Sequence, residues 1–461
     1  MKKATRPIKG RFFQRPWGIN DKPTEPGMPR RFVWLAVLWG AYFFAVFSFG
    51  RHEAWKQQII WIGGALLGTV TLAILGKRIK VIERETLLIA AFLGWALLGG
   101  FHVEYWPDYT YYFRLSIEML LVVALLGSVL RISGHIAPLW WAFLTVGIYN
   151  TLAIAMMGPV VLRGEWGSVE RATGLIDNPN GLAFLCFMGI LGALGIIGEK
   201  KSWKIRAVAA AGAFVAFYGM VAAGSRGAYL SFVIAGALWP VMCLGLWKKR
   251  RRARIFAAIA AAAIFYVTLT WIQEGTYLGM RTKMAFTRQD TSSEARLELV
   301  LKGLQIAAQN PVTGVGLGQF GLASGSDKYA HNEWAELLAT TGVPGFLIFI
   351  GVYWSAWRRL GRALRRASDP ITQYRINFAR MTLIILVVAG AVFRPNFLNV
   401  DTIFLLASVV GISWWAEDRT SRILALRASY NASLLSRRFA SRAENQACSA
   451  KADYSGTESR A

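Results

Sequence analysis

Long apolar segments recur along almost the whole chain, and short polar connections separate them. Runs of roughly 16 to 20 apolar residues are long enough to cross a bilayer as helices. Twelve such spans are expected, at about residues 32–50, 59–76, 86–101, 114–130, 138–157, 179–198, 207–223, 228–247, 255–272, 343–357, 381–393 and 402–416. A β-barrel would instead need short segments of alternating polarity. The pattern therefore predicts an all-α polytopic membrane protein.

The charge distribution gives the orientation of these spans. Apolar residues make up 55% of the 461 residues, and the net charge is +26, which suggests nucleic-acid binding at first sight. When the connections are assigned alternately to two sides, 39 of the 52 Lys and Arg residues share the side of both termini. The positive-inside rule then places both termini in the cytoplasm. The basic run at 248–254 is interpreted as a topology signal that contacts anionic lipids, and no nucleic-acid partner is expected.

Three parts of the chain are distinguished. Residues 1–31 form a basic cytoplasmic segment, 32–416 the twelve-span domain, and 417–461 a basic cytoplasmic tail. The first segment lacks the apolar core of a cleavable signal peptide, so the first span is expected to be retained. Residues 273–342 form a large outward loop before the tenth span, and a connection of this length is usually functional or structured.

The long outward loop carries a helix, a glycine-rich turn and a second helix. The first helix is expected at 292–311, with Leu297, Val300, Leu301, Leu304 and Ala308 on one face. The turn "GLGQFG" (316–321) fits a dinucleotide-binding pattern, but no βαβ unit surrounds it. It is interpreted as a chain reversal, with presentation of N–H groups to an anion as the alternative.

One of the four histidines lies in this loop, in "YAHNEWAELLATTGVPG" (329–345). His331 and Asn332 are expected to open a helix that ends at Gly342, with Pro344 at the head of the next span. An imidazole can accept a proton near neutral pH, because its ordinary pKa is about 6.5. A structural histidine bonded to a neighbouring helix is the alternative.

Several arginines are predicted on the same outward side, although that side is poor in basic residues. Arg226 lies between two spans in "AAGSRGAYLS", where a charge near membrane depth is usually functional. The others are Arg171 (near Asn180), Arg296, Arg394, Arg51 and Arg114. Guanidinium groups bind phosphate through two parallel hydrogen bonds. The set therefore indicates a phosphorylated, membrane-borne ligand and a proton-transfer step.

Four of these segments, in this order, resemble motifs of the bacterial O-antigen ligase and polymerase superfamily. They are "RATGLIDNPNGLAF" (171–184), "GSRGAYLS" (224–231), "EARLELVLKGLQIAAQNPVTGVGLGQF" (294–320) and "HNEWAELLATTGVPG" (331–345). The twelve-span layout is similar too. One departure is Thr340-Thr341, where the family more often has an acidic residue before its glycine.

The resemblance implies an inner-membrane glycosyltransferase whose twelve-span domain is catalytic. Such enzymes transfer a glycan from undecaprenyl pyrophosphate on the periplasmic face, and the ligases use lipid A–core as acceptor. By matching position, His331 is the expected general base or acceptor-orienting residue, and Arg226 and Arg296 are the expected pyrophosphate ligands. Further substrate-binding candidates are Arg171, Asn180, Asn332, Arg394 and Arg51. The outward acidic residues are scattered, so neither metal nor cofactor is expected, and direct displacement would invert the anomeric carbon.

Other functions remain open at this point. A polymerase or a protein O-oligosaccharyltransferase of the same superfamily would share the donor and differ in the acceptor. A lipid-linked glycan transporter would place its polar site near the bilayer midplane, within repeats that this sequence does not show. The aromatic segment "EYWPDYTYYF" (104–113) is interpreted as an interfacial belt, with sugar stacking as the alternative.

Overall fold

The computed structural model describes residues 30–49, 58–79, 82–157, 160–164, 167–172, 175, 178–200, 202–243, 270, 276, 278–279, 291–326, 328–392 and 399–455. Within these residues, eleven helices are long and apolar enough to cross a membrane. They match eleven of the twelve expected spans, and the remaining one, 255–272, lies almost wholly outside the described residues. The prediction of an all-α polytopic membrane protein is confirmed.

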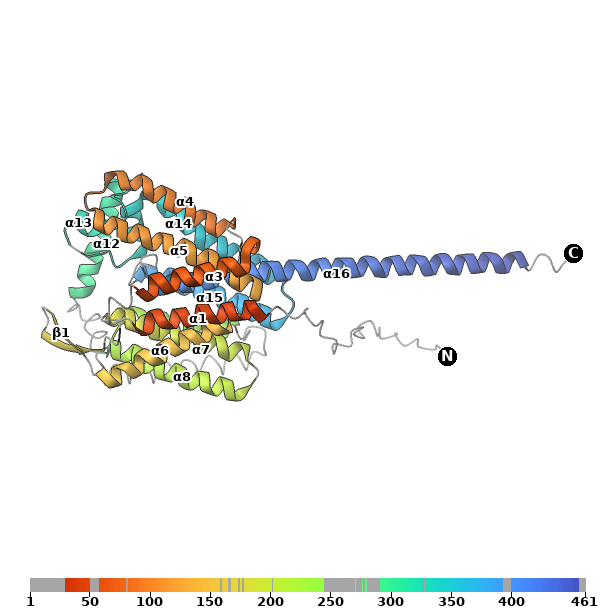
Figure 1. Cartoon of the computed structure of the whole chain (residues 1–461), viewed down its shortest axis with the longest axis horizontal. Helices are drawn as coiled ribbons and strands as arrows, with labels where there is room; N and C mark the ends of the chain where they lie inside the picture. The colour runs from red at the N-terminus through yellow and green to blue at the C-terminus, as the bar shows by residue number, and fades with distance from the viewer. Residues whose placement is uncertain are drawn as a thin grey trace, which may run out of the picture.

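The helices before the long loop form most of the bundle (Figure 1). They are α1 (Arg30–Ser48), α3 (Gly64–Leu75), α4 (Arg84–Gly99), α5 (Trp106–Ser133), α6 (Ala137–Met157), α7 (Pro179–Glu199), α8 (Trp203–Ala223) and α9 (Arg226–Leu238). A π-helical turn, Ile59–Gly63, leads into α3, and another, Trp239–Cys243, extends α9.

The connection between α6 and α7 departs from the all-helical expectation. It contains β1 (Val160–Gly164) and β2 (Gly167–Arg171), which pair antiparallel from Val160↔Arg171 to Gly164↔Gly167. This small hairpin lies outside the helical bundle (Figure 1). The fold class is unaffected, because the two strands form no sheet with any other described segment.

The remaining helices are α12 (Thr291–Gln309), α13 (Phe320–Ser324), α14 (Glu333–Arg366), α15 (Pro370–Val392) and α16 (Val400–Ser455). The last of these extends far beyond the bundle, and β1, α12 and α13 lie at the opposite end (Figure 1). We call these two ends of the bundle the tail end and the loop end. The candidate residues that the sequence assigns to the outward side, where the structure describes them, belong to segments at the loop end.

Small residues let the central helices pack closely. A Cβ atom at Gly147 would lie 3.0 Å from the Cα atom of Gly189, so α6 and α7 touch backbone to backbone. A Cβ atom at Gly411 would lie 3.0 Å from the Cα atom of Gly127, which brings α16 equally close to α5. Close contacts of this kind are how transmembrane helices associate, because lipid provides little hydrophobic drive between them.

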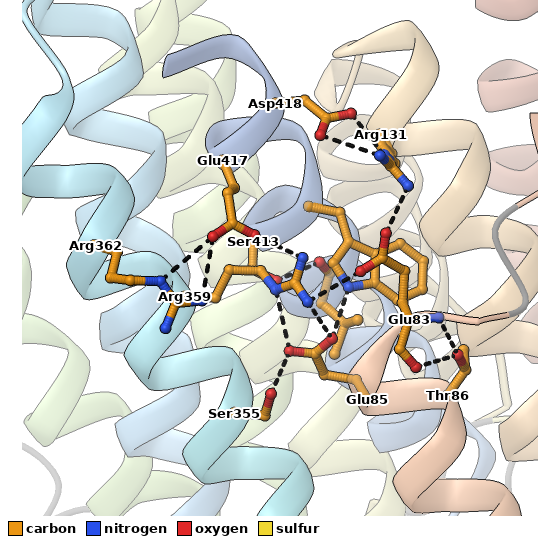
Figure 2. Close-up of polar contacts among 12 residues, drawn as sticks. Glu83, Glu85, Thr86, Arg131, Ser355, Arg359, Arg362, Ser413, Glu417 and Asp418 are labelled. Atoms are coloured by element: carbon orange, nitrogen blue, oxygen red, sulfur yellow. Dashed lines mark hydrogen bonds and ion pairs between the residues drawn. The ribbon is translucent and has the colours of Figure 1, made fainter. Parts of the chain in front are cut away.

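A buried ionic network joins four helices at the tail end (Figure 2). Glu85, in the first turn of α4, is 0% exposed and accepts hydrogen bonds from Ser355 Oγ at 2.7 Å and Trp414 Nε1 at 2.9 Å. Arg359 of α14 lies 3.2 Å from Glu85 and 2.7 Å from Glu417 of α16. Arg131 of α5 joins Glu83 at 2.8 Å to Asp418 at 2.7 Å. Each buried charge therefore has an opposite partner, as a low-dielectric surrounding requires.

Candidate active site

The helix α14 folds back on itself at Gly342. That residue has φ 66° and ψ −176° inside an otherwise helical run. Tyr353 Oη donates a hydrogen bond to Glu333 Oε1 over 3.4 Å, although 20 positions separate the two residues. A straight helix would hold residues that far apart by roughly 30 Å. We therefore describe α14 as a short arm (333–341) that packs against a long arm (343–366).

Backbone groups released by this reversal find partners on neighbouring segments. The carbonyls of Ala339 and Thr340 accept from the amides of Val315 at 2.9 Å and Gly316 at 3.0 Å. The Thr341 carbonyl accepts from Trp95 Nε1 at 2.8 Å. Unpaired backbone groups are costly inside a membrane, so these bonds make the break in the helix tolerable.

The glycine-rich turn is thereby shown to close the helix break. Its Gly316 amide is engaged by a carbonyl of α14, and a Cβ atom at Gly314 would lie 2.4 Å from the carbonyl carbon of Thr340. Only glycine permits this contact. The geometry thus favours the chain-reversal interpretation of the turn over presentation of its N–H groups to an anion.

His331 and Asn332 stand at the start of the short arm. Asn332 caps the helix, because its Oδ1 accepts from the amides of Trp334 at 2.9 Å and Ala335 at 3.0 Å. Its Nδ2 donates to the carbonyl of Ala391, at the end of α15, over 2.6 Å. The side chain that was expected to bind substrate therefore also fixes the short arm to α15.

Backbone strain accompanies the placement of His331. It has φ 53°, and it is the one non-glycine residue with positive φ in the described ranges. Its ring lies 4.1 Å from that of Tyr329, centroid to centroid. Left-handed backbone at a non-glycine residue is uncommon and concentrates at functional sites. The prediction that this histidine is functional is thus accompanied by a local conformation of the kind that functional sites show.

Two buried carboxyl groups stand in the first turns of the short arm. Glu333 is 0% exposed, and Glu336 is 3% exposed and accepts a hydrogen bond from the Ala330 amide. Carboxylates at a helix start interact favourably with the helix dipole. In the sequence, both residues were counted among the scattered outward acidic residues. Their burial results from the fold-back of α14, which the sequence does not show.

Arg296 lies on the face of α12 that packs against the short arm. On that face, a Cβ atom at Gly303 would lie 3.2 Å from Ala335 Cβ, and Leu299 and Ile306 are buried. Arg296 precedes Gly303 by about two helical turns, so it shares this face. It is half-buried. α12 runs beside the short arm in the same direction, with Gly303 against Ala335. Arg296, which precedes Gly303, therefore lies level with the residues that precede Glu333.

The expected apolar face of α12 exists, but it is exposed. Leu297, Leu301 and Leu304 are 61%, 57% and 47% exposed. The packed face holds Leu299, Gly303 and Ile306 instead. Since water disfavours an exposed leucine stripe, we expect this face of α12 to contact lipid hydrocarbon.

Arg226 begins α9 at the turn that follows α8. The segment after β2 approaches the same turn, because the Ala172 amide donates to the Ala222 carbonyl over 3.4 Å. This contact brings the backbone of Arg171, at the end of β2, near the α8–α9 turn; the side chain of Arg171 lies outside the description. The two predicted arginines therefore come from neighbouring segments.

The height of Arg226 along the bundle follows from a contact between α9 and α15. Trp239 Nε1 donates to Tyr374 Oη over 3.2 Å. Toward the loop end, Arg226 lies about 20 Å from Trp239 along α9, and Ala391 lies about 26 Å from Tyr374 along α15. Because Ala391 holds Asn332, Arg226 and His331 lie at similar heights.

The other candidates divide into two groups. Asn180 is half-buried in the first turn of α7, where its amide donates to the capping Asn178 Oδ1 at 2.9 Å. Arg394 and Arg51 lie outside the described residues.

Among the residues that are described, no three His, Cys, Asp or Glu side chains gather so that they could hold a metal ion. Metal independence is a separate prediction, which a chelator tests below.

The fold is that of a polytopic membrane protein with its candidate site at one end of the bundle. Residues 211–350 match the model of the family described as O-antigen ligase, which supports membership of the O-antigen ligase superfamily. The match thereby indicates an enzyme that acts on lipid-linked glycans. Both ligases and polymerases are compatible with it.

No curated protein matches the chain. One solved structure that the chain matches comes from work on "Structural coordination of polymerization and crosslinking by a peptidoglycan synthase complex". The match has 14% sequence identity and a TM-score of 0.42, and it covers 73% of this chain and 97% of that chain.

Proposed function

We propose that this protein is an O-antigen ligase of the bacterial inner membrane. In this proposal the loop end of the bundle faces the periplasm and both termini face the cytoplasm. The enzyme transfers a glycan from undecaprenyl pyrophosphate to the lipid A–core of lipopolysaccharide. The family match over 211–350 supports the coarser class. The observation that supports the proposed reaction centre is the fold-back of α14, with His331 at its start and α12, which bears Arg296, along its side.

In the proposed reaction, a hydroxyl oxygen of the acceptor sugar attacks the anomeric carbon of the donor glycan. His331 accepts the hydroxyl proton during attack, which contributes about 10²–10⁴-fold to the rate. The bond between the anomeric carbon and the pyrophosphate oxygen breaks, and that oxygen keeps the electron pair. Direct displacement inverts the anomeric configuration.

Arginines stabilise the leaving group in this scheme. Arg226 and Arg296 bind the pyrophosphate as its negative charge increases, with Arg171 and Arg394 as further ligands. Fixed guanidinium groups are effective here because they need little reorganisation during the reaction. They replace a divalent cation, so transfer should proceed in EDTA. Loss of activity in EDTA that magnesium or manganese restores would contradict this part of the proposal.

Reconstitution of the purified protein tests the proposal. The reaction contains undecaprenyl-pyrophosphate glycan, lipid A–core and EDTA, and it compares wild type with His331→Ala. Glycan-bearing lipid A–core from the wild type alone supports a ligase that needs His331. Product from both proteins supports a ligase but contradicts the role of His331 as the general base. Lengthening of the lipid-linked glycan without transfer to lipid A–core would identify a polymerase instead.

A further inference from the structure

A polar pocket at the loop end is distinct from the proposed reaction centre. It has a volume of about 450 Å³ and is lined by His102, Glu104, Asn310, Thr313 and Gln319, among others. Ligand pockets in proteins commonly have volumes of roughly 300–1,000 Å³. The pocket lies between the α4–α5 connection and the turn after α12, two segments that are far apart in the sequence.

The two walls of this pocket are held together by paired hydrogen bonds. Gln319 Oε1 accepts from the Tyr105 amide over 2.9 Å, and Gln319 Nε2 donates to the Tyr105 carbonyl over 2.8 Å. A Cβ atom at Gly316 would lie 2.7 Å from Val103 Cγ2, so the segments are also in close contact. The pocket is therefore pre-formed, and a ligand need not pay for ordering its walls.

The polar groups of the pocket suit a neutral sugar. Within the described residues, the Glu104 carboxylate forms no ion pair or hydrogen bond, and a carboxylate accepts hydrogen bonds from hydroxyl groups. The same carboxylate repels phosphate, which disfavours the pyrophosphate as an occupant. Tyr105 and Trp106, next to the pocket wall in the sequence, are 51% and 56% exposed. Such aromatic rings have an apolar face and a polar edge, and they can therefore pack against a sugar ring, which also has apolar and polar sides.

The position of the pocket separates it from bond formation. Its wall residue Val315 is hydrogen-bonded to Ala339, and roughly 9 Å of helix rise separates Ala339 from Glu333, the first helical residue after His331. In the proposed reaction, a sugar held beside Val315 is therefore remote from the one that reacts. Binding a remote part of a substrate can still hold its reacting end in place.

We propose that this pocket binds a non-reacting, neutral sugar unit of a glycan substrate. The inference rests on the proposed function, which supplies two glycans: the core oligosaccharide of the acceptor and the repeat unit of the donor. Both have the hydroxyl chemistry that the pocket recognises. Occupancy by the core would make the pocket an acceptor subsite, and occupancy by the repeat unit would make it a donor subsite.

Binding of soluble oligosaccharides tests this inference on the full-length protein. The probes are the delipidated core oligosaccharide and the repeat-unit oligosaccharide, both from the bacterium that encodes the chain, measured by calorimetry and saturation-transfer NMR. We expect one of them to bind. Glu104→Gln should weaken that binding at least tenfold, because it replaces a charge-assisted hydrogen bond. Asp108→Asn, which removes a neighbouring exposed charge outside the pocket, should leave binding within twofold of wild type.

The outcomes separate the pocket from the proposed function. The proposed sugar site is wrong if neither oligosaccharide binds to the wild type, or if Glu104→Gln binds as tightly as the wild type. This holds even if transfer is observed. His331→Ala should bind the oligosaccharide as the wild type does while losing transfer. If His331→Ala instead retains transfer, the proposed base is wrong and the pocket stands on its own binding data.

Discussion

Tyr353 donates its phenolic hydrogen bond to Glu333, a residue that begins the same helix 20 positions earlier. Trp334 supports the same reversal, because its ring lies 6.0 Å from that of Tyr353 and 6.3 Å from that of Phe346. Aromatic pairs at these distances add stabilisation beyond burial alone. The start of the short arm, with His331 just before it, is thus held by side-chain packing and not only by its connection to a loop.

Gly342→Ala should destabilise the protein by about 2–5 kcal/mol, because a Cβ atom there meets both strain and a clash. The residue has φ 66°, and its Cβ would lie 2.1 Å from the Val312 carbonyl oxygen. Thermal unfolding in detergent measures the effect. Gly361→Ala is the matched control in the long arm, since its Cβ would meet nothing within 4 Å. Equal melting temperatures for the two variants would contradict the fold-back of α14 at Gly342.

Asn332→Ala and Asn332→Asp separate the two tasks of this side chain. Aspartate retains the helix cap but cannot donate to the Ala391 carbonyl, whereas alanine loses both contacts. We expect alanine to cost about 1–2 kcal/mol for the cap in addition to the lost hydrogen bond. Unfolding midpoints rank the proteins as wild type, then aspartate, then alanine. An aspartate variant less stable than the alanine variant would speak against the capping role.

Arg226→Lys and Arg296→Lys should each lower kcat/KM by about 10–100-fold, because lysine keeps the charge and loses the paired hydrogen bonds to phosphate. The reconstituted transfer assay measures the change. Arg366→Lys, at the exposed far end of α14, is the control and should transfer at the wild-type rate. Wild-type kinetics in both site variants would remove these arginines from the pyrophosphate site.

Glu85→Gln should destabilise the tail end by about 1–3 kcal/mol, because Arg359 loses one of its three carboxylate partners in a buried network. The carboxylate is 0% exposed. Glu298→Gln is the comparison, since Glu298 pairs with Lys302 at 3.1 Å on an exposed surface of α12. Such surface pairs contribute about 0–1 kcal/mol. Similar losses of stability in the two variants would show that the network contributes less than its burial implies.

The exposed stripe of α12 should contact lipid hydrocarbon. A nitroxide label at Leu301→Cys is then more accessible to oxygen than to a water-soluble nickel complex. The reverse holds for Lys302→Cys, which lies about 100° further round the helix and belongs to the polar face where Lys302 pairs with Glu298. Electron paramagnetic resonance in lipid nanodiscs measures both. Preferential access of the nickel complex to position 301 would mean that the stripe faces water or an open cavity.

The sequence was sufficient for the eleven described spans and for where α14 breaks, because hydropathy and a glycine before a proline are local signals. It could not give the direction of the chain after the break. That direction is set by Val315, Gly316 and Trp95, which satisfy the released carbonyls from distant segments. The same limit explains α12, whose leucine stripe is periodic, although only the position of Gly303 against Ala335 determines which face is packed.

The tail-end network was equally hidden from sequence reasoning. Glu83 and Glu85 stand beside basic residues at a predicted span boundary, where they add little to a topology argument. Their partners Arg131 and Arg359 belong to α5 and α14, and these arginines pair in turn with Asp418 and Glu417 of α16. Such pairings are properties of the tertiary fold, and no local periodicity encodes them.

The hydrogen bond between Asn332 and the carbonyl of Ala391 has a consequence for how the protein is made. The ribosome synthesises the segments with Arg226, Arg296 and His331 well before it reaches the end of α15. Until that helix has been inserted, the start of the short arm lacks one of its anchors. A nascent chain that stops before Ala391 therefore contains all three of these residues, but the helix start beside His331 still lacks its anchor on α15. The arrangement around His331 is therefore completed late in biogenesis.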